Sequence, residues 1–216
     1  MITVVIANNQ EENVVKLTYE NLWKELKDIP GAELFVADHW LDYSLSSNSK
    51  NKYVCFVEAD CLVNSGYFSS QLGLFKKNTM FRKLAMLSSG VGVNDWANKF
   101  YGYTVGDNYS DGVIPIKTNK SKSLYPVQIG YVPGAIIRKS MLIAALADLK
   151  PNNSWEKDLV FLSTQLSLTF WRQGDGNPVY INPNTTYVTT EDYVNDIGKF
   201  DSGAGDLVNM FARESI

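Results

Sequence analysis

Hydrophobic residues along the chain gather in short continuous runs separated by polar segments. Three such runs, at residues 3–7 (TVVIA), 33–37 (ELFVA) and 53–57 (YVCFV), are rich in β-branched and aromatic residues. Because their apolar positions are consecutive rather than alternating, we expect buried strands that are covered on both faces. Shorter runs at residues 84–87 and 127–132 are expected to add strands to the same sheet.

Apolar residues spaced three or four positions apart predict helices between these runs. The spacing is seen over residues 11–26, after the turn at residues 64–66, and over residues 138–149 and 155–172. Strands that alternate with helices are typical of an α/β domain. We therefore expect one domain with a central mixed, mostly parallel sheet and helices on both faces.

The remaining segments are less regular. Residues 88–126 are rich in glycine, asparagine and serine and are expected to be mostly loop with short strands, and residues 179–181 and 186–189 are expected to be short strands. We assign residues 1–190 to the single domain. Residues 191–216 form a glycine-containing tail that is a candidate lid.

Composition excludes several classes of protein. The chain has 216 residues, 45% of them hydrophobic, and 20 basic against 23 acidic residues give a net charge of −3. These values exclude a disordered chain and do not fit a broadly basic nucleic-acid binder. A single histidine, His39, excludes a zinc site built from several histidines, and Cys55 and Cys61 lack the C-x-x-C spacing of a redox pair.

Targeting signals are not evident either. The N-terminus lacks a basic region followed by a long apolar run, and no stretch approaches the ~18 apolar residues of a membrane span. A soluble cytoplasmic protein is therefore expected.

Polar side chains follow three of the predicted strands where each strand ends. Asn8 and Asn9 follow the first strand, Asp38 follows the second, and Glu58 and Asp60 follow the third. In open α/β sheets, ligands bind outside the carboxyl ends of the parallel strands. The sequence therefore predicts a ligand site at this edge.

Two of these acids suit a divalent cation. If the segment stays extended, Glu58 and Asp60 point to the same side and their carboxylates can converge. Mg²⁺ and Mn²⁺ commonly bind one or two carboxylates together with substrate phosphates. The alternative is that both acids belong to an ordinary surface turn.

Several segments together resemble a known family, the nucleotide-diphosphate-sugar glycosyltransferases of the GT-A fold, especially the large inverting group with a D-x-D-like motif. The best match is YVCFVEADCLVNSGYF, which combines a strand, an acidic triplet and a small polar turn. Shorter matches are TVVIANNQEEN, ELFVADHW, VPGAIIRKSML, SWEKDLVFLSTQL and VYINPNTTYV. The resemblance covers roughly residues 3–190 as a series of short segments.

The resemblance implies a role for individual residues. Asp38 corresponds to the acid that reads the nucleoside base, and Glu58 and Asp60 to the metal and diphosphate triplet, with Asp60 nearer the metal. Glu156 corresponds to the general base, with Asp158 as the alternative within the same E-K-D segment. The implied donor-binding set is Ala7, Asn8, Asn9, Asp38, Glu58, Ala59, Asp60 and Gly134.

Two departures from the family pattern concern the metal. The triplet begins with glutamate instead of aspartate, and the late histidine of the family has no counterpart. A hydroxyl, a carboxylate or water would have to replace that histidine; the residues near its expected place are Thr189, Thr190, Glu191 and Asp192.

The resemblance thus implies a transferase that uses Mn²⁺ or Mg²⁺ and moves a sugar from a nucleotide-diphosphate donor, with a UDP-sugar and inversion favoured. The acceptor stays open between a glycan, a lipid-linked sugar, a protein and a modified nucleic-acid base. One alternative is a non-catalytic carbohydrate-binding or scaffold protein on the same fold. A sugar nucleotidyltransferase is less favoured, because residues 8–12 (NNQEE) lack the glycines and bases that grip a triphosphate.

Overall fold

The computed structural model describes most of the chain. The described residues are 1–8, 10–38, 50–77, 84–97, 99–105, 113–119, 121–148, 159–173 and 178–189. Within them, no helix is both long enough and apolar enough to cross a membrane. The candidate lid at residues 191–216 lies outside the described residues.

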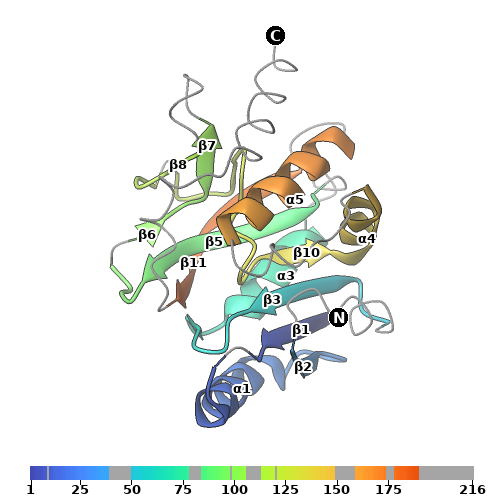
Figure 1. The fold of residues 1–216 in the computed structure, drawn as a ribbon, viewed down its shortest axis with the longest axis vertical. Coiled ribbons are helices and arrows are strands. Elements are labelled where there is room, and N and C mark those ends of the chain that lie inside the picture. Colours follow the sequence, from blue (N-terminus) through green and yellow to red (C-terminus); the bar gives the residue numbers. More distant parts are fainter. Residues whose placement is uncertain are drawn as a thin grey trace.

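A twisted sheet forms the centre of the molecule (Figure 1). Its strands lie in the order β2-β1-β3-β10-β5-β11-β4, which correspond to Glu33–Ala37, Ile2–Ala7, Tyr53–Val57, Ile136–Arg138, Met86–Val93, Val179–Thr189 and Leu62–Val63. Strands β2, β1, β3, β5 and β11 run in one direction, because β10 is antiparallel to both β3 and β5. The prediction of a mixed, mostly parallel sheet is confirmed.

Short strands complete the described sheet structure. The strand β6 (Lys99–Phe100) pairs with β5, and β9 (Tyr125–Pro126) pairs with β11. The strands β7 (Tyr103–Val105) and β8 (Val113–Pro115) form a separate antiparallel pair.

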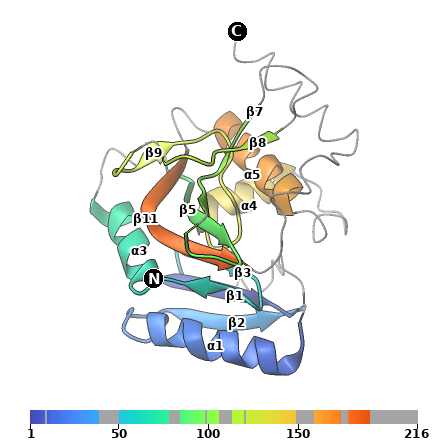
Figure 2. The ribbon, with the colours of Figure 1, turned by 90° about the vertical axis from the view of Figure 1, so that its left-hand side faces the viewer.

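Helices cover the sheet on both sides. They are α1 (Glu12–Leu26), α3 (Tyr67–Lys77), α4 (Lys139–Asp148) and α5 (Leu159–Gln173). Figures 1 and 2 together place α3 on one face of the sheet and the α4–α5 pair on the other, as predicted.

The burial pattern explains why these segments form these elements. All six residues of β1 and all five of β3 are buried, as expected for inner strands covered on both faces. The edge strand β2 is only partly buried. The helix α1 buries Val15, Thr18, Leu22 and Leu26, which recur at steps of three or four residues along one face.

Three predictions about secondary structure are wrong. The strand β5 continues to Val93, although its Ser-Ser-Gly-Val-Gly sequence suggests a loop. Residues 127–132 are not a strand; the next strand is β10 at Ile136–Arg138, whose last residue falls in the segment 138–149 that was predicted as a helix. The two predicted short strands near the C-terminus are one strand, β11, with an irregularity between Asn182 and Thr186.

Candidate functional site

The ends of β1 and β2 bring two predicted donor-binding residues together. The Asn8 side-chain amide donates a hydrogen bond to Asp38 Oδ1 over 3.0 Å, and the Asn8 backbone N–H donates to the Ala37 carbonyl over 2.7 Å. Both Asn8 and Asp38 are exposed, whereas the Ala7 side chain is buried in the strand before them. An exposed carboxylate beside an amide can exchange hydrogen bonds with a planar base.

Residues 58–61 form a turn and not the extended segment that the sequence suggested. The Cys61 backbone N–H donates to the Glu58 carbonyl over 3.3 Å, and the Thr18 hydroxyl of α1 donates to the Ala59 carbonyl. Glu58 is only 2% exposed, whereas Asp60 is half-buried. The two acids therefore do not share one environment, because alternation of side chains holds only in extended backbone.

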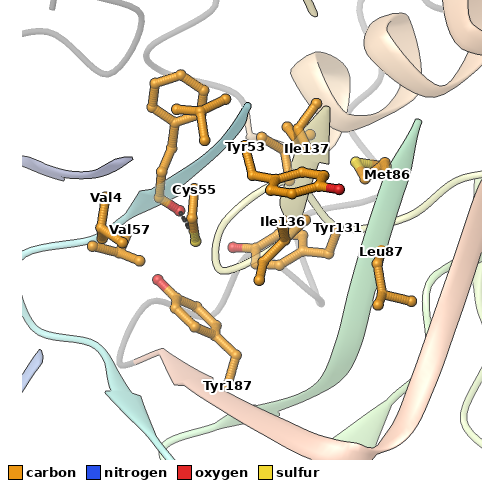
Figure 3. Close-up of a cluster of buried hydrophobic side chains, with 14 of the residues drawn as sticks. Val4, Tyr53, Cys55, Val57, Met86, Leu87, Tyr131, Ile136, Ile137 and Tyr187 are labelled. Atoms are coloured by element: carbon orange, nitrogen blue, oxygen red, sulfur yellow. Dashed lines mark hydrogen bonds between the residues drawn. The ribbon is translucent and has the colours of Figure 1, made fainter. Parts of the chain in front are cut away.

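The Glu58 side chain faces the core, where it meets Tyr187 of β11. The Tyr187 hydroxyl donates to Glu58 Oε2 over 2.8 Å and accepts from the Glu58 backbone N–H over 3.1 Å. Figure 3 shows Tyr187 reaching from β11 towards the end of β3, where Val57 is labelled. Tyr187 was not predicted as a site residue, and it lies 129 positions from Glu58 along the chain.

The Asp60 carboxyl is the more accessible acid of the turn. Burial raises the pKa of Asp60 above its ordinary value of 3.8, and a hydrogen bond from its own backbone partly offsets this. A neighbouring cation would favour the charged form of this carboxyl.

We expect the Asp60→Asn variant to change how stability depends on pH. Because the folded-state pKa is raised, the wild-type protein should lose stability as the pH rises from below 3.8 through that raised value. The uncharged asparagine removes this loss. Urea unfolding in the presence of a chelator should therefore show the variant gaining stability relative to wild type as the pH rises. A difference in the free energy of unfolding that does not change with pH would contradict the raised pKa of Asp60.

Gly134 is in contact with residues of β3, α3 and β11. Its backbone N–H donates to the Phe56 carbonyl over 2.7 Å, and its carbonyl accepts from the Tyr67 hydroxyl over 2.7 Å. Its φ is +74°, and a Cβ built there would lie 2.4 Å from Cδ2 of Tyr187. These contacts give Gly134 a packing role against Tyr187, and its predicted donor contact stays a prediction.

We expect Gly134→Ala to destabilise the protein by about 3 kcal/mol. The added methyl group would be forced against the Tyr187 ring, which costs about 1–3 kcal/mol. A non-glycine residue at positive φ adds a cost of about 1–3 kcal/mol. Chemical denaturation measures the change in the free energy of unfolding. Gly73 provides the matched control, because a Cβ at that helical position meets nothing within 4 Å. A Gly134→Ala variant as stable as Gly73→Ala would contradict the packing role.

The two cysteines lie in the core. Cys55 and Cys61 are both free and buried. Burial raises the pKa of each thiol, and for Cys61 the Glu58 carboxylate adds to the increase. A pocket of about 300 Å³ lies between α1 and β4 and is lined by Glu25, Cys61 and Leu62 among others.

Three predicted site residues lie outside the described residues: Asn9, Glu156 and Asp158. The helix α5 begins at Leu159, directly after Asp158, the alternative base. Within the described part of the chain, no three histidine, cysteine or acidic side chains converge as a ready-made metal site. A cation at Asp60 could take further oxygen ligands from a bound phosphate, which Mg²⁺ and Mn²⁺ readily accept.

Comparison with known proteins shows the class of fold. No protein-family model and no curated protein sequence matches the chain. Two crystal structures of S. aureus TarS, a glycosyltransferase, are similar in fold. The first has a TM-score of 0.55 and 10% sequence identity over 96% of this chain; the second, of TarS 1–349, has 0.51 and 14% over 88%.

The chain spans 42% of the first TarS structure and 60% of the second. At such low identity the likeness shows a fold shared with TarS and does not show a shared activity. One fold can carry different activities, because activity depends on the residues of the site.

Proposed function

We propose that this chain is a glycosyltransferase domain that moves a sugar from a nucleotide-diphosphate donor to an acceptor hydroxyl. The observation that carries the proposal is the position of Asp38 and Asp60. They follow β2 and β3, which lie on either side of β1 and run parallel to it. Both acids therefore lie at the edge of the sheet where ligands of α/β folds bind.

The Asn8–Asp38 pair would recognise the nucleoside. An ionised aspartate only accepts hydrogen bonds, whereas the asparagine amide both donates and accepts. Uracil offers an N–H donor between two carbonyl acceptors, which complements this pair. We therefore propose a UDP-sugar as the donor.

The turn that contains Asp60 would hold the diphosphate end of the donor. Asp60 offers a half-buried carboxylate for Mn²⁺ or Mg²⁺, with the donor phosphates as further ligands. When bound, the cation neutralises the charge of the departing nucleotide. Glu58 supports the same turn from inside the core.

The acceptor would be activated by a carboxylate just before α5. We propose Glu156 as the general base, with Asp158 as the alternative, taking the proton from the attacking hydroxyl. Attack on the face opposite the departing nucleotide would invert the anomeric centre. The acceptor classes remain those that the sequence left open.

A thermal-shift screen of nucleotide sugars with and without Mn²⁺ tests the proposal. A ligand that binds only the folded state at 100 times its Kd adds about 2.7 kcal/mol, which raises the Tm of a domain of this size by about 5–10 °C. We expect such a shift with UDP-sugars and Mn²⁺ together. If no nucleotide sugar gives a Mn²⁺-dependent shift, the proposed function is wrong.

A further inference from the structure

We propose that Tyr187 is a positioning residue of the donor site: it holds Glu58 inside the core, so that the turn presents Asp60 to the donor diphosphate. This inference rests on the proposed function for the role of Asp60. The restraint of the turn by Tyr187 does not depend on that function and follows from contacts on both sides of the turn.

The Tyr187 ring has little freedom to move. Tyr187 is fully buried. One face lies against Gly134, where a Cβ would come within 2.4 Å of the ring, and the Tyr131 ring centroid is 6.4 Å away. Close-packed interiors transmit such constraints, because side chains there have no void to move into. The hydroxyl is therefore held at a fixed point beside the turn.

That hydroxyl binds Glu58 twice. It donates to the side-chain carboxylate and accepts from the backbone N–H of the same residue. Two hydrogen bonds to one residue fix both its backbone and the direction of its side chain.

The backbone of Tyr187 holds the other end of the turn. In the antiparallel pairing of β11 with β4, Tyr187 is opposite Val63 and Val188 is opposite Leu62. Tyr187 thus contacts both ends of the turn. Its side chain binds Glu58 before the turn, and its backbone belongs to the strand that pairs with β4 after the turn. The acids separate as a result, with Glu58 buried and Asp60 half-exposed.

Tyr187→Phe removes only the hydroxyl and keeps the ring against Gly134. The matched control is Tyr103→Phe, which removes the same atom from another fully buried tyrosine on a different strand, β7. Each variant is examined by two measurements. One is the labelling rate of Cys61 by a maleimide, relative to that of Cys55, resolved by mass spectrometry. The other is the Kd of UDP with Mn²⁺.

The labelling ratio tests the hold without any ligand. Cys61 ends the turn and Cys55 lies within β3, and both are fully buried, so labelling requires opening. We expect Tyr187→Phe to raise the Cys61-to-Cys55 ratio about tenfold and Tyr103→Phe to leave it within about twofold of wild type, since a lost buried hydrogen bond of about 1.4 kcal/mol corresponds to a factor of ten. An unchanged ratio in Tyr187→Phe would overturn the proposal.

The binding measurement tests the consequence of the hold. We expect Tyr187→Phe to weaken Mn²⁺-dependent UDP binding about tenfold in the wild-type background and by a smaller factor in the Glu58→Ala background, because only one of the two hydrogen bonds of the Tyr187 hydroxyl is to the Glu58 side chain. Additive losses would contradict that route. If the wild-type protein shows no Mn²⁺-dependent binding, the proposed function fails and with it the role in presenting Asp60, whereas the labelling ratio still reports whether Tyr187 holds the turn.

Discussion

The Asp60→Ala variant is expected to lose the Mn²⁺-dependent part of UDP binding, a weakening of about 100-fold or 2.7 kcal/mol. The reason is that Asp60 is the half-exposed carboxylate of the turn, whereas Glu58 is engaged by Tyr187 in the core. The fold should persist, with the free energy of unfolding within about 1 kcal/mol of wild type, because burial already disfavours the charged carboxylate. Isothermal titration of UDP with and without Mn²⁺ measures the effect.

Asp28→Ala is the matched control for this variant. Asp28 is an exposed acid between α1 and β2. It precedes its strand, whereas Asp60 follows β3, so the two acids belong to opposite ends of the parallel strands. The same substitution there should leave UDP affinity within about twofold of wild type. Equal losses in both variants would indicate a general effect of net charge and contradict the site.

The second large effect is expected at the predicted base. Glu156→Gln should lower the rate of transfer, or of donor hydrolysis in the absence of an acceptor, by about 10²–10⁴-fold, the range contributed by general base catalysis. The glutamine keeps the size of the side chain and cannot take a proton. The Kd for UDP with Mn²⁺ should stay within about threefold of wild type, because the base contacts the acceptor and not the nucleotide.

Asp158→Asn separates the two candidate bases. If Glu156 is the base, Asp158→Asn keeps most of the activity, and the reverse result would assign the role to Asp158. Single-turnover rates with a fixed donor compare the two variants directly. Wild-type rates in both variants would rule out this segment as the source of the base.

Much of the architecture was predictable because buried strands have a strong local signal. Continuous apolar runs gave the bounds of β2 and β3 as the structure has them, and the spacing of apolar residues gave α1 to within one residue. The same signal failed for β5. Its serines and glycines are typical of a loop, but in the structure they pack closely against other segments of the same chain. The Ser88 hydroxyl, for example, donates a hydrogen bond to the Tyr131 carbonyl.

The candidate site was only partly predictable. Asn8 and Asp38 each follow a strand, so their meeting depends only on β1 and β2 being parallel neighbours. The contact between Glu58 and Tyr187 depends on the order of strands in the whole sheet and on the turn at residues 58–61, neither of which leaves a local signal. From the sequence, Glu58 and Asp60 were consequently expected to face one cation together, with Asp60 nearer to it.

The central claim is that Asp60, on the turn after β3, binds a cation that holds the donor diphosphate. Crystals of the protein soaked with manganese and UDP test it most directly, because manganese is identified by its anomalous scattering. We expect one anomalous peak bonded both to the Asp60 carboxylate and to the UDP phosphates, with the uracil at Asn8 and Asp38. Density for UDP and manganese away from Asp60, or an empty site at saturating concentrations, would contradict the account.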